Sequence, residues 1–237
     1  MRCYLAICLR AIVHRVGRVQ ARGNVRGHSM PIELHAFDTP NGRKISVALE
    51  EMALPYCVRI VDIRSGQQHA PDFLEISPNG KIPAIVDPDG PGGKPVSVFE
   101  SGAILIYLGE KTGKFWPRDL AARIPVLEWL MFQQGGFGPI PGQVHHFVTV
   151  ENEADRRYGL ERFAKETRRL YSVMDRRLAT QEFFADEPSI ADFAILGWAW
   201  RHPRHKVDLA EFPHVRRWYE AMMARPGVQR GFAVQMS

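Results

Sequence analysis

The first part of the chain alternates short apolar runs with segments whose apolar positions recur every three or four residues. Residues 32–37 predict a strand, and a turn over residues 39–42 separates them from residues 44–52, where the apolar spacing is helical. Residues 56–63 are rich in β-branched side chains and predict a second strand. The pattern therefore begins as strand, helix, strand.

The same alternation continues to residue 113. Residues 71–77 predict a short helix, and residues 82–86 and 96–99 flank a turn-rich stretch, which predicts an antiparallel hairpin. Residues 103–111 are helical in pattern, with Gly113 where a terminating glycine belongs. The order β-α-β-α-β-β-α predicts a mixed four-stranded sheet with helices on its faces.

Beyond residue 117 the strand signals stop and one-faced helical patterns take over. The clearest pattern is a set of residues spaced three or four apart: Leu160, Phe163, Thr167, Leu170, Met174 and Leu178. The glycine and proline residues between 135 and 142 must interrupt regular helix. We therefore expect an α/β domain over residues 30–113 and an all-α domain over residues 118–232.

Composition and charge narrow the class of protein. The 237 residues are 45% hydrophobic and 24% charged, which is typical of globular domains. The net charge of +5 comes from residues 1–29, which hold six arginines and no acidic residue, so the rest of the chain sums to −1. A nearly neutral body gives no indication of a nucleic-acid partner. No apolar run approaches the roughly 18 residues of a membrane span, so we expect no membrane partner.

The basic segment 1–29 has three interpretations. Arg10 interrupts the apolar stretch that a secretory signal needs, and Ser29 is the only serine where a transit peptide would hold several. Met30 directly precedes the first predicted strand. A start assigned too early, a targeting segment and a genuine arm stay open, and the fold prediction excludes this basic leader.

Cysteine usage indicates a reducing compartment. Cys3 and Cys8 lie in the leader, and Cys57 is the one cysteine in the sequence after residue 29, so the body holds no pair of cysteines for a disulfide or a Cys-x-x-Cys site. His145 and His146 diverge if helical and have no third ligand nearby, so we expect no metal. We expect a cytoplasmic protein in which Cys57 fills the core and any redox-active sulfur comes from outside the chain.

Three motifs now coincide with the element order. Residues 79–83 (Asn-Gly-Lys-Ile-Pro) place a proline at the entry of a strand, residues 99–104 place Glu100 and Ser101 where a strand gives way to a helix, and residues 189–192 form a capping box. Together they resemble the cytosolic glutathione transferase fold, a thioredoxin-like domain followed by a helical one. The resemblance covers about residues 31–232.

The subclass is legible in three further segments. Residues 39–44, 129–147 and 158–163 look like the bacterial nu-class transferases, which are related to the yeast prion-forming nitrogen regulator. Members of that group are glutathione-dependent disulfide-bond reductases with some organic hydroperoxide reductase activity. The resemblance implies this activity, glutathione as co-substrate, a small disulfide or peroxide as the other substrate, and a homodimer.

The resemblance also implies where glutathione binds. A helix N-terminus suits a carboxylate, so Ser101 is expected to hold the γ-glutamyl carboxylate and Glu100 the ammonium group. The backbone of Ile82 would pair with the cysteinyl backbone, given a cis bond before Pro83, which the fold implies. Gln68 and Lys81 are expected to reach the glycyl end.

The glutathione thiol needs groups that stabilise its charged form, because the thiolate is the nucleophile. Thr39 and Asn41 stand at the N-terminus of the first helix and are assigned this catalytic role. Both are also good capping residues, and capping alone is the alternative.

The helical domain supplies the remaining expectations. Arg162 is assigned to glutathione carboxylates, including those of a second bound glutathione, and Phe132 and Phe137 to the wall of the electrophile pocket. Ser189 and Asp192 are expected to be structural. Two alternatives to a disulfide reductase stay open: a transferase that conjugates or cleaves another electrophile, and a non-catalytic glutathione-binding regulator.

Overall fold

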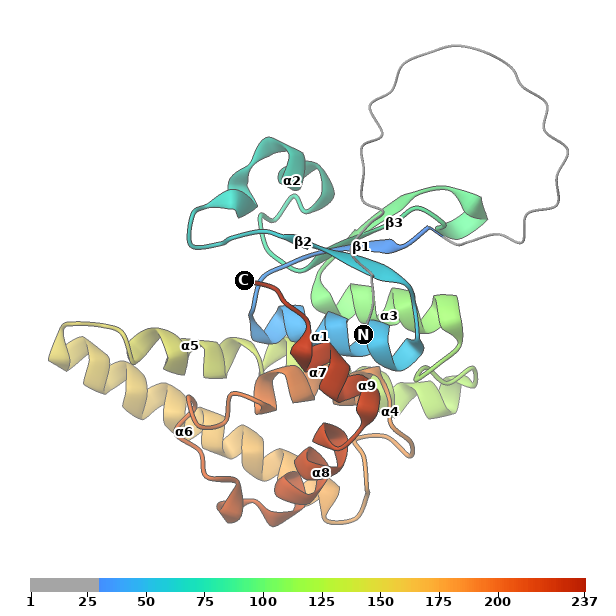
Figure 1. The fold of residues 1–237 in the computed structure, drawn as a ribbon. Coiled ribbons are helices and arrows are strands. Elements are labelled where there is room, and N and C mark those ends of the chain that lie inside the picture. The colour runs from blue at the N-terminus through green and yellow to red at the C-terminus, as the bar shows by residue number, and fades with distance from the viewer. Residues whose placement is uncertain (1–29) are drawn as a thin grey trace, which may run out of the picture.

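The structure is a computed structural model that describes residues 30–237. The three interpretations of the leader concern residues outside this described part. Figure 1 shows a sheet with helices on both faces, joined to a larger helical part.

The sheet has the strand order β2-β1-β3-β4. The central β1 (Ile32–Ala36) pairs in parallel with β2 (Tyr56–Ile60) and antiparallel with β3 (Ala84–Asp87). The edge strand β4 (Val96–Phe99) pairs antiparallel with β3 and completes the hairpin. The predicted mixed four-stranded sheet is therefore confirmed.

Helices cover the two faces of the sheet unequally. On one face lie α1 (Pro40–Met52) and α3 (Ser101–Thr112), which pack against each other. On the other face lies the short α2 (Pro71–Ile76), preceded by the 3-10 helix η1 (Gln67–His69). Phe73 of α2 packs there in a small cluster with two residues near the sheet, Val61 and Ala84. The face with α1 and α3 is the one that joins the main core.

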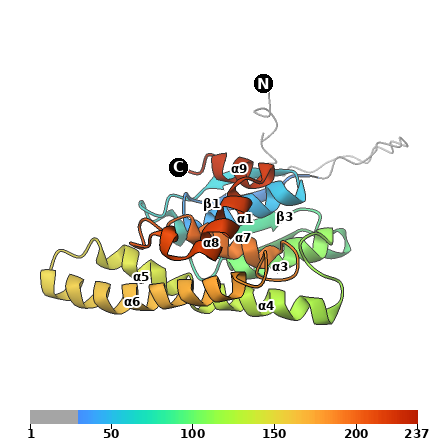
Figure 2. The ribbon, with the colours of Figure 1, turned by 90° about the horizontal axis from the view of Figure 1, so that it is seen from below.

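The helical part begins at Leu120, after α3. Its α-helices are α4 (Leu120–Gly135), α5 (Pro139–Phe147), α6 (Glu153–Leu178), α7 (Ile190–Ala199), α8 (Pro213–Met223) and α9 (Pro226–Ala233). In Figure 2, α4, α5 and α6 lie along the lower edge of the molecule. None of the helices within residues 30–237 is long and apolar enough to cross a membrane.

Helix α1 is the element on which the two parts meet. It packs against both α7 and α9, and glycines permit the close approach: a Cβ on Gly231 of α9 would lie 2.6 Å from Cα of Val47. The Ser46 hydroxyl donates to the Gly231 carbonyl at 2.8 Å, and Arg43 donates to the Val234 carbonyl at 2.7 Å. The start of α1 is thereby held between the sheet and the helical part.

The predicted element order is confirmed, and the differences are at the boundaries. The first helix begins at Pro40 rather than at residue 44, because Thr39 caps it and proline fits the first turn. The second strand ends at Ile60 and the third begins at Ala84, so both are shorter than predicted. The glycine and proline residues do break the helix, but only between Gly135 and Pro139.

Candidate functional site

The turn from β4 into α3 presents Glu100 and Ser101. Glu100 has a positive φ of 68°, a conformation that side chains rarely adopt, and its carboxylate does not cap the helix that follows. Its Oε1 lies 3.4 Å from Nδ2 of Asn79, on the exposed side. The Glu100 side chain therefore leaves the first N–H groups of α3 uncapped. Its carboxylate, an acceptor for an ammonium group, stands directly beside them.

Ser101 is nearly buried, 5% exposed, and its hydroxyl oxygen accepts two hydrogen bonds from within the protein. The donors are Nζ of Lys44 at 3.1 Å and Nε2 of Gln134 at 3.3 Å. A hydroxyl oxygen has two lone pairs, so both are engaged and the O–H must donate elsewhere. The start of α3 thus offers a hydroxyl donor next to backbone donors, which suits a carboxylate.

Lys44 is a site residue that the sequence analysis missed. It is 1% exposed, and its Nζ also donates to Oε1 of Gln133 at 2.6 Å. Burial lowers the pKa of Lys44 to about 7, against the opposing effect of the Glu100 carboxylate. A buried lysine shows no signal in a helical pattern, because its partners lie on α3 and α4.

The start of α1 holds Thr39 and Asn41, both half-buried. Thr39 is the N-cap, and its Oγ1 accepts from the Gly42 amide at 3.1 Å. Oδ1 of Asn41 accepts from Nε1 of Trp198 at 2.9 Å. The capping role of Thr39 is thus observed. Because both oxygens accept, the Thr39 hydroxyl hydrogen and the Asn41 amide N–H groups are left as donors.

Asn41 and Lys44 are three residues apart and share one face of α1. That face turns toward α7, where Gly197 approaches so closely that a Cβ would lie 2.6 Å from the Pro40 carbonyl oxygen. Through Lys44 the same face reaches Ser101. The starts of α1 and α3 are therefore parts of one arrangement.

The loop before β3 lies beside Glu100. The Ser77 hydroxyl donates to the Lys81 carbonyl at 2.8 Å, and the Ile82–Pro83 peptide bond is cis, as expected. Lys81 is exposed and Ile82 half-buried. Asn79 of this loop supplies the contact with Glu100, so the loop borders the start of α3.

Gln68 lies in η1 against this loop: a Cβ on Gly80 would lie 3.3 Å from the Gln68 carbonyl oxygen. Its Nε2 is 3.2 Å from Nε2 of His69, and within the described residues its buried Oε1 has no hydrogen-bond partner. Gln68, Lys81, Ile82 and Glu100 thus border one neighbourhood.

The residues predicted from the helical domain are less closely associated. Arg162 is exposed on α6, with its guanidinium 5.9 Å from the centre of the Phe163 ring, and within residues 30–237 no hydrogen bond or ion pair joins it to the start of α3. Phe137 is fully buried and packs edge-on against Tyr171 at 5.0 Å, so it belongs to the core rather than to an open pocket wall. Phe132 is half-buried and stacks beside it at 6.4 Å.

Ser189 and Asp192 form the predicted capping box at the start of α7. Asp192 accepts from the Ser189 amide at 2.9 Å, and the Ser189 hydroxyl oxygen accepts from the Ala191 amide at 3.3 Å. Asp192 also accepts from Nε1 of the buried Trp218 at 2.8 Å. The pair is structural, and Asp192 ties α7 to α8.

The ring of Trp198 is part of a stack with the rings of two histidines. The ring of His145 lies 5.7 Å from the Trp198 ring and 4.9 Å from the ring of His205, whose Nδ1 is 3.0 Å from the Tyr171 hydroxyl. Burial lowers the pKa of His145 to about 4 and that of His205 to about 3, so both rings are neutral at pH 7. No group of three or more metal-ligating side chains occurs within residues 30–237.

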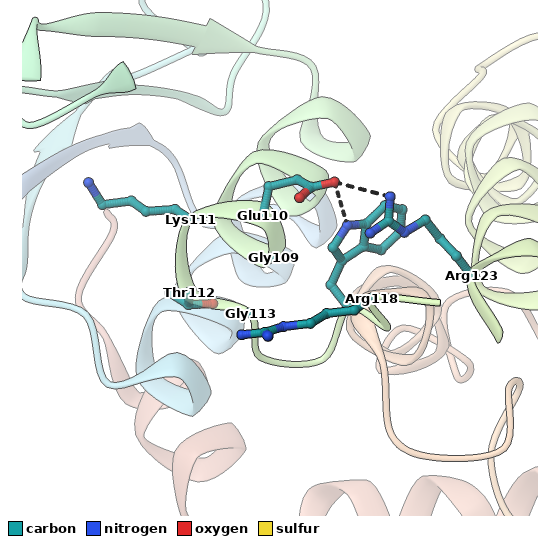
Figure 3. A pocket seen from close by; sticks show the side chains of 8 residues that line it. Gly109, Glu110, Lys111, Thr112, Gly113, Arg118 and Arg123 are labelled. Carbon is teal, nitrogen blue, oxygen red and sulfur yellow. Dashed lines mark hydrogen bonds and ion pairs between the residues drawn. The ribbon is translucent and has the colours of Figure 1, made fainter. Parts of the chain in front are cut away.

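A surface hollow of about 210 Å³ lies at the other end of α3 (Figure 3). Glu110 bridges it by accepting from Nε1 of Trp116 at 2.8 Å and pairing with Arg123 at 3.3 Å. Its helix end is C-terminal and presents carbonyl groups, so this hollow is unrelated to the carboxylate site at Ser101.

Comparison with known proteins assigns both parts of the chain. The family model described as "Glutathione S-transferase, N-terminal domain" matches residues 39–111, and "Glutathione S-transferase, C-terminal domain" matches residues 139–226. The Escherichia coli protein named disulfide-bond oxidoreductase YfcG is 46% identical over 197 residues, which cover 82% of this chain and 91% of that protein.

Solved structures agree. A Pseudomonas putida glutathione transferase with one glutathione disulfide bound per subunit superposes with a TM-score of 0.80 at 41% identity, covering 86% of this chain and 91% of its own. A Burkholderia graminis glutathione transferase with two glutathione molecules bound per subunit gives the same TM-score and identity, covering 85% and 87%. The sheet with its helical partner, the start of α3 and these similarities lead to one conclusion: the chain belongs to the glutathione S-transferase family.

Proposed function

We propose that this protein is a glutathione-dependent disulfide-bond reductase that also reduces organic hydroperoxides. One observation carries the proposal: the start of α3 presents a Ser101 hydroxyl held by two donors beside a Glu100 carboxylate that does not cap the helix. This pair of groups complements the carboxylate and ammonium of a γ-glutamyl head. The similarity to a disulfide-bond oxidoreductase supports the choice of reaction.

The remaining groups follow from the direction of the bound tripeptide. The Ile82 backbone receives the cysteinyl residue, and Gln68 and Lys81, which border the same neighbourhood, receive the glycyl carboxylate. The thiol then lies toward the start of α1. There the Thr39 hydroxyl and the Asn41 amide donate to the sulfur and favour its thiolate, since a free thiol with a pKa near 8.5 is only a few per cent ionised at neutral pH.

The reaction needs two glutathione molecules and no cysteine of the chain. The first thiolate attacks one sulfur of the disulfide, forms a mixed disulfide and expels the other half as a thiolate. A second glutathione thiolate attacks the mixed disulfide, which yields glutathione disulfide and the second reduced product. With a hydroperoxide, two glutathiones give the alcohol, water and glutathione disulfide. Two glutathiones occupy each subunit of the Burkholderia graminis relative, and we assign Arg162 to the second one.

The place of Cys57 agrees with this scheme. It pairs in register with Glu33 at the beginning of β1, whereas Thr39 follows the end of that strand. Strands advance about 3.3 Å per residue, so the Cys57 sulfur lies at the opposite end of the sheet from the proposed thiolate.

We also propose that the protein is a cytoplasmic homodimer. The exposed side of α4 carries Leu120, Ile124 and Met131, which are 67%, 48% and 51% exposed, and Phe99 is exposed on the edge strand β4. Apolar side chains at helical spacing on one exposed face favour a protein partner. A reducing cytoplasm supplies the glutathione that the reaction consumes.

The test compares substrates under identical conditions: a symmetric dialkyl disulfide, an organic hydroperoxide and an aromatic halide, each with glutathione. We expect turnover of the disulfide, coupled to glutathione reductase, with less on the peroxide. Turnover of the halide alone would favour a conjugating transferase, and glutathione binding without any turnover would favour a regulatory protein.

Variants separate binding from chemistry. Ser101→Ala is expected to raise the KM for glutathione, whereas the double variant Thr39→Ala, Asn41→Ala lowers kcat and leaves glutathione affinity within a few-fold. The exposed Ser97 on β4 provides the control Ser97→Ala. Unchanged kcat in the double variant would refute the thiolate role of Thr39 and Asn41.

A further inference from the structure

The side chain of Lys44 runs through the protein interior and reaches Ser101 from the buried side of the proposed glutathione site. It leaves α1 beside α7, where a Cβ on Gly197 would lie 2.8 Å from its Cγ, so only glycine admits the aliphatic part of the lysine there. Its Nζ ends between α3 and α4, within hydrogen-bond distance of Ser101 and Gln133. Two of its three donors are thus accounted for by neutral oxygens of the described residues.

This position is costly for a charged group. A lysine that is 1% exposed loses its hydration, and neutral oxygens replace only part of it. The charged side chain of the described residues that acts on Lys44 is Glu100, the N-cap residue of α3. Helix α4 contributes the amides Gln133 and Gln134, and α7 contributes Gly197. The Glu100 carboxylate is exposed and turned toward Asn79, so it does not pair directly with Lys44.

An anion bound at Ser101 would supply the counter-charge that the Lys44 ammonium lacks. Ser101 lies at the first position of α3 beside the Lys44 ammonium, and both of its lone pairs accept hydrogen bonds from within the protein, so its proton is left to donate to another group. An anion that accepts this proton would sit one hydroxyl group away from the ammonium. We infer that Lys44 is a positioning residue for glutathione, which orients the Ser101 hydroxyl and gains its counter-ion, together with a proton, when the γ-glutamyl carboxylate binds. This inference rests on the proposed function.

The sign of the linkage follows from the burial of Lys44. Because the pKa of Lys44 before glutathione binds is about 7, its side chain is only about half protonated at neutral pH. A bound carboxylate raises that pKa again, so binding takes up a proton. Affinity should therefore be constant below pH 7 and fall as the pH rises above it.

Calorimetry on the full chain tests whether ligand binding takes up a proton. S-methylglutathione is the probe, because it has no thiol to ionise, and at pH 7 its amino group is already protonated. Titrations in two buffers of different ionisation enthalpy should reveal uptake of up to about half a proton per site. Zero uptake with normal binding would overturn the inference and leave the proposed function intact. No binding of the probe would overturn both.

A matched pair of variants tests the residue. Lys44→Met keeps most of the length of the side chain but removes its charge, and Lys114→Met removes the same charge from an exposed lysine that donates to the Met52 carbonyl at the far end of α1. Lys44→Met should weaken S-methylglutathione binding about tenfold, the loss expected for a charge-assisted contact, and abolish proton uptake. Lys114→Met should change neither.

The folded state of each variant is checked by cooperative urea unfolding. If Lys44→Met folds and binds with unchanged affinity, or retains the proton uptake, Lys44 has no positioning role. If it fails to fold, the calorimetry is done on His69→Gln, which removes the titratable ring beside Gln68 and leaves Lys44 in place. Proton uptake that persists in His69→Gln supports the inference, and its loss there would overturn it.

Discussion

At the scale of single residues, some residues of the site can be predicted from the sequence, whereas others can be identified only once the fold is known. Glu100 and Ser101 are adjacent and stand at a strand-to-helix junction, so a local pattern identifies them. Lys44 meets Ser101 and Gln133 from 57 and 89 positions away. Its role depends on which helices become neighbours, and a helical pattern in one sequence does not contain that information.

The free energy of unfolding should depend on pH in a way that shows the effect of burying Lys44. Burial lowers the pKa of Lys44 from 10.5 to about 7, so between these values the unfolded chain binds more protons than the folded one. The free energy of unfolding of the wild type should therefore rise with pH in this window, relative to Lys44→Met, and run parallel to it below pH 7. Urea unfolding at several pH values measures this difference, and parallel curves throughout would contradict the cost of burying the charge.

Trp198 has a comparable role on the other side of α1. Its indole N–H holds Oδ1 of Asn41, which leaves the amide N–H groups of Asn41 to donate to sulfur. Trp198→Phe should lower kcat about two- to tenfold, the equivalent of one neutral hydrogen bond, with little change in the KM for glutathione. A lower kcat should be accompanied by a higher pKa of the bound thiol, measured by thiolate absorbance. A change in KM alone would contradict the positioning of Asn41.

At the scale of elements, the sequence predicts which elements exist better than where they end. The β-branched run after residue 56 extends to residue 63, yet β2 ends at Ile60, because Asp62 turns the chain by binding the Arg64 amide. The break after α4 is shorter than the glycine and proline residues suggest, since Pro139 and Pro141 fit the first turn of α5. Phe137 falls inside this break and turns into the core, which no periodic pattern foresees.

The capping box of α7 provides the clearest test of an element. Ser189→Ala removes the acceptor for a backbone amide at the helix start and should lower the free energy of unfolding by about 0.5–2 kcal/mol. The activity per folded molecule should stay constant, because the pair is structural. Ser172→Ala, at a half-buried serine of α6, is the control and should change stability by no more than about 0.5 kcal/mol. A loss of activity without a loss of stability would contradict the structural role of the pair.

At the scale of the whole molecule, the sequence predicts two parts, but their junction is visible only in the structure. The α/β order and the helical periodicity follow from local spacing. The meeting of α1 with α7 and α9 depends on glycines such as Gly197 and Gly231, whose importance comes from the neighbour that each one admits. That junction holds Asn41 and Lys44 in place, so the site owes its geometry to contacts between the two parts.

The proposed dimer is tested at this scale. Light scattering should give twice the chain mass of 26.9 kDa. The double variant Ile124→Glu, Met131→Glu places charges on the exposed face of α4 and should shift the protein to monomers, whereas Tyr158→Glu on the exposed face of α6 should not. A monomeric wild type, or a dimer that survives the α4 changes, would contradict the proposed interface.

The central claim is that bound glutathione, rather than a cysteine of the protein, supplies the reactive thiolate. The most direct measurement is glutathione-dependent reduction of a dialkyl disulfide by the full chain in which Cys3, Cys8 and Cys57 are all replaced by alanine. The account predicts kcat/KM within about a factor of two of the wild type. Loss of turnover in a cysteine-free protein that still folds and binds S-methylglutathione would contradict it.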